Sequence, residues 1–125
     1  TYCVIGDLSF FYDQNALWNQ NLKGNLRILL QNNGGGGIFE KFDGLKGSPV
    51  RDTCVMASHN TSAEGICKQC NVKYLSVKNE DEYRKALEEL TEPKSDRPIL
   101  LEVFTNSEKD MEALNNYYKH IKENI

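Results

Sequence analysis

With 125 residues, of which 39% are hydrophobic, the chain is long enough to bury one core and short enough to form one domain. A net charge of −3 gives no basic surface of the kind that binds nucleic acid. Since no apolar run reaches membrane-spanning length and the amino terminus lacks a signal-peptide pattern, we expect no transmembrane segment and a cytoplasmic protein.

The first part of the chain is predicted to form a strand, a crossover helix and a second strand. Two short apolar runs, at residues 2–5 and 26–30, are bounded by turn-forming residues, which is typical of buried strands. Residues 10–22 between them have the length of a helix, so the two strands should be parallel neighbours. Asp7 and Asn33 would then follow the carboxyl ends of adjacent strands, the edge of an α/β sheet where ligands bind.

Asp7 and Asn33 have the chemistry of a magnesium–phosphate site. Carboxylate and amide oxygens suit Mg²⁺, which takes its remaining ligands from phosphate and water. Ser9 could cap the following helix and so direct backbone N–H groups at the same anion. The glycines at residues 34–37 would let the backbone approach a ligand closely. The same residues also form common turns, and a glycine run can be a flexible loop, so both interpretations stay open at this point.

Helices and strands are predicted to alternate along the rest of the chain. An irregular segment with one helical turn is expected over residues 40–56, where Gly44, Gly47 and Pro49 indicate a loop. Capping patterns at 61–64 and 79–82 are expected to begin two helices, and a last helix is expected to start at 107–110. Apolar runs at 72–77 and 99–104 are expected to form two strands. The alternation predicts a three-layer α/β fold with a mostly parallel sheet and helices on both faces.

Apolar residues at helical spacing indicate which side of each helix faces the core, and Asn71 can end the second helix in a left-handed conformation. The expected inward-facing residues are Phe10, Leu17 and Trp18; Ala63, Ile66, Cys67 and Cys70; Tyr83, Ala86, Leu87 and Leu90; and Met111, Leu114, Tyr118, Ile121 and Ile125.

Cysteine and histidine offer few sites. Cys67 and Cys70 form a C-x-x-C, which can be a redox pair or half a zinc site, but no second pair stands at zinc spacing. Because both thiols fall on an apolar helix face, we interpret them as core residues. His120 is expected on the surface, and His59, in a loop before a helix, is kept as a candidate site residue.

Beyond these patterns the chain resembles a known family. Gly6-Asp7 followed by Asn32-Asn33 across one βαβ unit is similar to the diphosphate-binding motif of thiamine-diphosphate enzymes. The longer sequences around this motif, GDLSFFYD and NNGGGGIF, resemble those of one branch of the family. This branch is the 2-succinyl-5-enolpyruvyl-6-hydroxy-3-cyclohexene-1-carboxylate synthases of menaquinone biosynthesis. The resemblance is close over residues 4–39 and weaker beyond. Most thiamine-diphosphate enzymes have Gly or Ala directly after Gly-Asp, whereas this chain has Leu8, which matches the menaquinone branch. The gap from Asp7 to Asn32-Asn33 is one residue shorter than the commonest spacing in thiamine-diphosphate enzymes.

The resemblance implies roles for individual residues. Asp7, Asn33 and the backbone carbonyl of Gly35 match the ligands of Mg²⁺, or of Mn²⁺ in its place. The matched cofactor-binding residues are Gly6, Asp7, Leu8, Ser9, Asn33, Gly35, Gly36, Ile38 and Phe39. Ile38 and Phe39 match residues lining the reactive end of the cofactor and the substrate pocket, and Phe42 is a further pocket candidate. No substrate-binding arginine is carried over to Arg27 or Arg51.

The resemblance also implies that residues 1–125 are the carboxyl-terminal part of the diphosphate-binding domain of a longer enzyme. We expect a piece of such an enzyme, since the chain opens inside a predicted strand. The family enzyme decarboxylates 2-oxoglutarate and adds the succinyl carbanion equivalent to isochorismate. Its activating glutamate lies in an amino-terminal pyrimidine domain, usually of a neighbouring subunit in a homodimer or homotetramer. No catalytic residue is therefore expected in this chain, which should be inactive alone.

Three other functions fit part of the pattern. Another thiamine-diphosphate enzyme, such as an acetolactate synthase or a 2-oxoacid decarboxylase, would share the motif, although the sequence Gly-Asp-Leu-Ser argues against such an enzyme. A non-catalytic flavodoxin-like phosphate-binding module would share the sheet but would not need Asp7 and Asn33 on one metal. A structural interface domain would bind neither metal nor cofactor.

Overall fold

The structure, a computed structural model, describes residues 1–45 and 47–124. The chain divides into two compact units. The sheet unit comprises Thr1–Asn32 and Thr61–Phe104, and the glycine-loop unit comprises Asn33–Asn60 and Thr105–Ile125.

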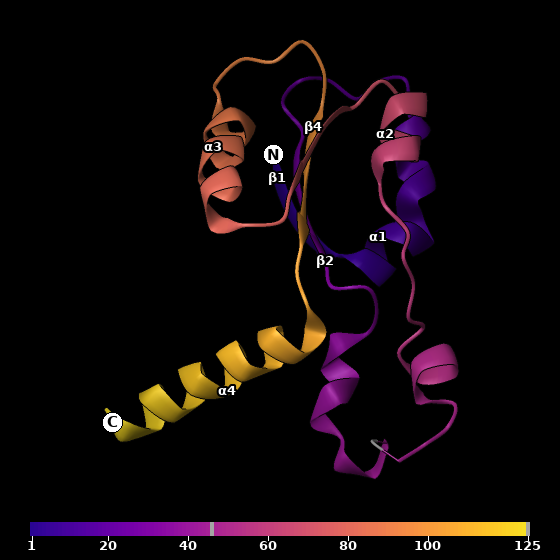
Figure 1. Cartoon of the computed structure of the whole chain (residues 1–125). Helices are drawn as coiled ribbons and strands as arrows, with labels where there is room; N and C mark the ends of the chain where they lie inside the picture. Colours follow the sequence, from indigo (N-terminus) through magenta and orange to yellow (C-terminus); the bar gives the residue numbers. More distant parts are fainter. Residues whose placement is uncertain (46, 125) are drawn as a thin grey trace. The chain divides into compact units, whose positions relative to one another are not determined.

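The sheet unit contains a four-stranded sheet in which every strand runs parallel to its neighbours. The strands are β1 (Tyr2–Gly6), β2 (Arg27–Asn32), β3 (Lys73–Val77) and β4 (Ile99–Phe104), in the order β1-β2-β4-β3. Helices α1 (Asp7–Asp13) and α2 (Glu64–Gln69) cover one face, and α3 (Glu80–Thr91) covers the other (Figure 1). The predicted α/β fold and the parallel pairing of the first two strands are confirmed.

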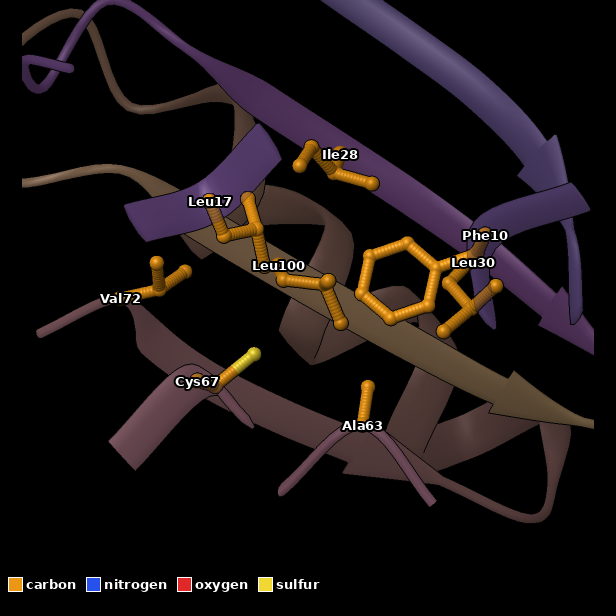
Figure 2. Close-up of a cluster of buried hydrophobic side chains, with 8 residues drawn as sticks. All are labelled: Phe10, Leu17, Ile28, Leu30, Ala63, Cys67, Val72 and Leu100. Carbon is orange, nitrogen blue, oxygen red and sulfur yellow. The ribbon is translucent and has the colours of Figure 1, made fainter. Parts of the chain in front are cut away.

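Alternate residues of the central strands face two separate cores. Leu100 points to the α1/α2 side of the sheet, whereas Ile99 and Leu101 point to the α3 side. Helices on both faces explain why β2 and β4 read as continuous apolar runs, as is usual in parallel sheets. The α1/α2 core, drawn in Figure 2, consists of Phe10, Leu17, Ile28, Leu30, Ala63, Cys67, Val72 and Leu100. The α3 core consists of Val77, Leu90, Ile99 and Leu101.

The first crossover is shorter and more varied than expected. α1 ends at Asp13 and is followed by the 3₁₀ helix η1 (Gln14–Trp18). Phe10 and Leu17 are buried as predicted, but Trp18 is 66% exposed, so its predicted inward position is wrong. A 3₁₀ helix has three residues per turn instead of 3.6, and this change of period turns Trp18 away from the face that Leu17 occupies.

Two predicted helix caps are wrong, and a third is confirmed. α1 begins directly at Asp7 after an extended Gly6, so Ser9 lies inside the helix and caps nothing. α2 begins at Glu64 with Ala63, not Thr61, at the N-cap position; Glu64 N donates to Ser62 Oγ at 3.1 Å, and Ala63 N donates to the buried carboxylate of Glu102. At α3 the Asn79 side chain accepts from Glu82 N, as predicted. Asn71, with φ 55°, has the expected left-handed conformation.

The glycine-loop unit consists of short helical turns and one long helix. The turns are η2 (Gly37–Lys41), η3 (Asp43–Leu45) and η4 (Arg51–Val55), so the segment holds more than the single turn expected. α4 (Ser107–Glu123) begins where predicted and packs against η2. Along α4, Met111, Leu114 and Ile121 are partly buried. Tyr118 is 51% exposed, contrary to the prediction, and Ile125 lies outside the described residues.

The interpretation of Cys67 and Cys70 as core residues is confirmed. Cys67 is completely buried, and Cys70 packs partly buried against the same core. In the part of the chain that the structure describes, no cluster of three His, Cys, Asp or Glu residues could hold a metal ion. Within the same residues, no helix is both long and apolar enough to span a membrane. Burial, the charge of Glu102 and the neighbouring Cys70 raise the pKa of Cys67 to about 12.

This raised pKa is expected to make the fold lose stability in alkali. Above pH 9.0, the ordinary thiol pKa, the unfolded chain gives up the Cys67 proton while the folded chain retains it. The free energy of unfolding should therefore fall with rising pH, by at most about 1.4 kcal/mol per pH unit from this group. Urea unfolding followed by circular dichroism across this range measures the slope. Cys67→Ala should flatten it, whereas the exposed thiol variant Cys54→Ala should not; equal slopes in both variants would refute the assignment.

Candidate functional site

Asp7 stands at the junction of β1 and α1. Gly6, the last residue of the strand, is extended, and the helix starts at the next residue. The Asp7 side chain is 3% exposed, and its Oδ1 accepts a hydrogen bond of 2.7 Å from the backbone N–H of Leu8. Among the described residues other than Gly6 and its two chain neighbours, no heavy atom lies within 4 Å of a Cβ built on Gly6, so there is open space beside this residue.

Asn32 and Asn33 have different surroundings despite being adjacent. Asn32 is buried, and its Nδ2 donates to the Thr61 carbonyl at 2.8 Å and to Glu102 Oε1 at 2.7 Å. Asn33 is partly buried, and its Nδ2 donates to Asp110 Oδ2 at 3.4 Å. Asn32 therefore serves the sheet core, whereas the Asn33 amide turns its NH₂ group toward Asp110 and its oxygen away from it.

The glycine loop is held in place by backbone hydrogen bonds. Gly36 N donates to the Met56 carbonyl at 2.7 Å, and His59 N donates to the Gly34 carbonyl at 3.0 Å. Gly34 has φ 79°, which favours glycine, and a Cβ on Gly35 would lie 2.9 Å from the Met56 carbonyl oxygen. The backbone geometry thus requires glycine at Gly34 and Gly35, and hydrogen bonds join the loop to Met56 and His59.

His59 lies beside Asn33 in a small pocket of the glycine-loop unit. The pocket is also lined by Gly34 and Ser107. His59, which the sequence offered as a candidate, therefore lines the same pocket as Asn33, although no chemistry is assigned to its ring. His120 is exposed, as expected.

Comparison with protein families decides what these features belong to. Residues 1–103 match the family described as "Thiamine pyrophosphate enzyme, C-terminal TPP binding domain". The chain belongs to this family.

Curated proteins that resemble the chain share one name. The 2-succinyl-5-enolpyruvyl-6-hydroxy-3-cyclohexene-1-carboxylate synthase of Bacteroides thetaiotaomicron is 46% identical over 123 residues, which are 98% of this chain and 22% of that protein. The synthases of Phocaeicola vulgatus and Christiangramia forsetii are 45% and 40% identical, over 97% and 95% of this chain and 22% and 20% of theirs. The chain thus spans about a fifth of the length of these relatives.

The donor groups present fit the metal that a TPP-binding domain of this family would hold. Asp7 supplies a buried carboxylate, Asn33 an amide oxygen, and the loop supplies carbonyls of glycines. These are hard oxygen donors of the kind that Mg²⁺ prefers. The Gly35 carbonyl accepts from Gly37 N at 3.0 Å, and a carbonyl oxygen has a second lone pair for a cation.

The remaining candidate pocket residues lie in or directly after η2: Ile38 and Phe39 in it, and Phe42 next to its end. Ile38 is 65% exposed and Phe42 is 54% exposed, while Phe39 is partly buried with its ring centroid 6.4 Å from that of Phe42. Large apolar side chains exposed together often mark a binding surface. Arg27 and Arg51, to which no substrate-binding role was carried over, have other partners. Arg27 is buried and donates to the Glu92 carbonyl, and Arg51 pairs with the carboxylates of Glu40 and Asp52.

Sequence reasoning missed two acidic residues. Glu102 is completely buried and accepts from Asn32, from Ala63 N and, at 2.5 Å, from the Tyr74 hydroxyl. A single carboxylate within the apolar run of β4 was the signal that could have pointed to it. Asp110 gave no such signal, because it lies among other charged residues at the start of α4.

Proposed function

We propose that this chain is the carboxyl-terminal part of the cofactor-binding domain of a 2-succinyl-5-enolpyruvyl-6-hydroxy-3-cyclohexene-1-carboxylate synthase. Such an enzyme decarboxylates 2-oxoglutarate and transfers the succinyl group to isochorismate in menaquinone biosynthesis, with thiamine diphosphate and Mg²⁺, or Mn²⁺, as cofactors. The observation that carries the proposal is the 46% identity to synthases of this name over nearly the whole chain. Identity at this level extends beyond the motif shared by all thiamine-diphosphate enzymes and disfavours the acetolactate-synthase and decarboxylase alternatives.

In this proposal the chain binds and orients the cofactor. Asp7, Asn33 and the Gly35 carbonyl would hold the metal, which would supply positive charge for the diphosphate. Gly6, Leu8, Ser9 and Gly36 border the diphosphate; the open space beside Gly6 supports this placement. When bound, thiamine diphosphate supplies the carbon nucleophile and the electron sink for decarboxylation.

The apolar residues Ile38 and Phe39 of η2, and Phe42 just after it, have the second role. Ile38 and Phe39 line the reactive end of the cofactor, and Phe42 extends this surface toward the substrate. Their exposed apolar area supports the assignment, because covering it would exclude water from the reacting groups.

The proposal assigns no catalytic acid or base to this chain. The activating glutamate belongs to the amino-terminal pyrimidine domain, which residues 1–125 do not contain, and the cofactor is held between the two domains in a cytoplasmic homodimer or homotetramer. The support is the family match together with the share of the relatives that the chain covers.

Cofactor and metal are expected to bind only together. In the complete enzyme, removal of Mg²⁺ with a chelator should weaken thiamine-diphosphate binding at least about tenfold in calorimetric titration, because the positive charge that would attract the diphosphate is lost. Turnover of 2-oxoglutarate with isochorismate should need both, and the isolated chain should show none. Phosphate binding without metal would favour a phosphate-binding module, and no response to either would favour a structural domain.

A further inference from the structure

A metal ligand that is an asparagine must present the correct end of its amide. The oxygen can coordinate a cation, whereas the NH₂ group can only donate hydrogen bonds. The two ends are nearly equal in size, and rotation about the last side-chain bond exchanges them. An asparagine that serves as a ligand therefore benefits from a neighbour that accepts hydrogen bonds and so selects one orientation.

Asp110 is such a neighbour of Asn33. Its carboxylate oxygen Oδ2 lies 3.4 Å from Asn33 Nδ2. The same oxygen accepts a 2.7 Å hydrogen bond from the Thr105 hydroxyl, which holds the carboxylate in place. An ionised carboxylate only accepts, so it attracts the NH₂ end of the amide and repels the oxygen end.

The position of Asp110 is set by the start of α4. Asn106 caps this helix, since its side-chain oxygen accepts from Glu108 N and Lys109 N at 3.1 Å. Its carbonyl also accepts the first helical bond, from Asp110 N at 2.9 Å. The side chain that faces Asn33 is therefore fixed by a well-capped helix of 17 residues.

Gly37 completes the surroundings of the Asn33 amide. A Cβ at residue 37 would lie 2.7 Å from Asn33 Nδ2 and 3.7 Å from Ser107 Cβ. Any side chain at this position would push the amide away from Asp110. The last glycine of the run thus leaves room for the NH₂ group, a role different from backbone approach to a ligand.

We propose that Asp110, held by Thr105, is a positioning residue that turns the Asn33 amide oxygen toward the metal. The inference rests on the proposed function, in which Asn33 is a ligand. It adds a residue distant in sequence, on α4, whose effect on metal binding passes through Asn33. Asp110 itself need not touch the metal, the cofactor or the substrate.

The test is a double-mutant cycle on metal affinity in the complete enzyme. Binding of Mn²⁺ at saturating thiamine diphosphate is measured from the electron paramagnetic resonance signal of the free ion, so no turnover is needed. Asp110→Ala should weaken Mn²⁺ binding about tenfold or more, the usual effect of removing a residue behind a metal ligand. Asp110→Asn, whose amide oxygen can still accept, should recover most of the affinity. Glu112→Ala, which removes an exposed charge from the same helix, should change nothing.

The decisive comparison is made in the Asn33→Ala background. There Asp110→Ala should have no further effect, because the side chain through which it acts is gone. Additive losses, or full affinity in Asp110→Ala while Asn33→Ala is impaired, would overturn the inference and leave the proposed function intact. Full affinity in Asn33→Ala would instead refute Asn33 as a ligand, and the inference with it. If Asp110→Ala does not fold, as judged by circular dichroism, the cycle is run with Thr105→Val, which should weaken binding several-fold only while Asn33 is present.

Discussion

Replacement of Asp7 by alanine in the complete enzyme is expected to weaken Mg²⁺-dependent binding of thiamine diphosphate by about 3 to 5 kcal/mol, or about a hundredfold or more. Asp7 is the only anionic side chain among the proposed metal ligands. Its carboxylate is buried, and without it the cation would face only neutral oxygens. Calorimetric titration of thiamine diphosphate at fixed Mg²⁺ gives the affinity directly.

The control for this variant is Asp13→Ala. Asp13 is the last residue of α1 and is exposed, so its replacement removes the same charge from the same helix without touching the junction with β1. Asp7→Asn keeps an oxygen donor without the charge and should fall between wild type and Asp7→Ala. Unchanged cofactor affinity in Asp7→Ala, with Asp13→Ala also unchanged, would show that Asp7 does not bind the metal.

The sheet could be predicted because its signals are local. Residues 2–5 and 26–30 are short apolar runs between turn formers, and the intervening segment has only one simple way to connect parallel neighbours. The positions of Asp7 and Asn33 directly after β1 and β2 follow from the same argument. The strand order β1-β2-β4-β3 could not be obtained in this way, since it depends on contacts between distant parts of the chain.

The errors have two causes, contacts with distant residues and a helix whose period differs from that of an α-helix. Thr61 and Glu64 have the spacing of a capping box, but Ala63 is the N-cap residue: Glu64 N donates to Ser62 Oγ, and Ala63 N donates to Glu102 from β4. Trp18 was placed inward by an α-helical period that η1 does not have. Asp110 bonds to a residue 77 positions earlier, a pairing that no short-range pattern encodes.

Replacement of Glu102 by leucine is expected to cost the fold about 3 to 5 kcal/mol. The Glu102 carboxylate is completely buried and accepts from Ala63 N at 3.1 Å, from Tyr74 Oη at 2.5 Å and from Asn32 Nδ2 at 2.7 Å. Leucine fills a similar volume but leaves these donors without their acceptor. Each buried donor that loses its acceptor costs about 1 to 3 kcal/mol, although Asn32 retains its bond to the Thr61 carbonyl.

Glu102 also joins three parts of the sheet unit. Its partners come from β2, from β3 and from the residue before α2, so its loss loosens the α1/α2 core beneath them. The pKa of Tyr74, which burial and the hydrogen bond to Glu102 raise to about 12, reports on the same contact. In Glu102→Leu the phenol should titrate at lower pH, because the negative charge and the acceptor beside it are gone.

Equilibrium urea unfolding followed by circular dichroism measures the loss of stability, and ultraviolet absorbance measures the Tyr74 titration. Glu88→Leu, which removes an exposed carboxylate from α3, is the matched control and should change the unfolding free energy by less than about 0.5 kcal/mol. Glu102→Gln should lose less than Glu102→Leu, because the amide keeps one accepting oxygen. Tyr74→Phe and Glu102→Leu should combine to less than the sum of their separate losses, since each removes the same hydrogen bond. Stability equal to wild type in Glu102→Leu would mean that these donors find other partners, and that the carboxylate does not hold the ends of β2 and α2 together.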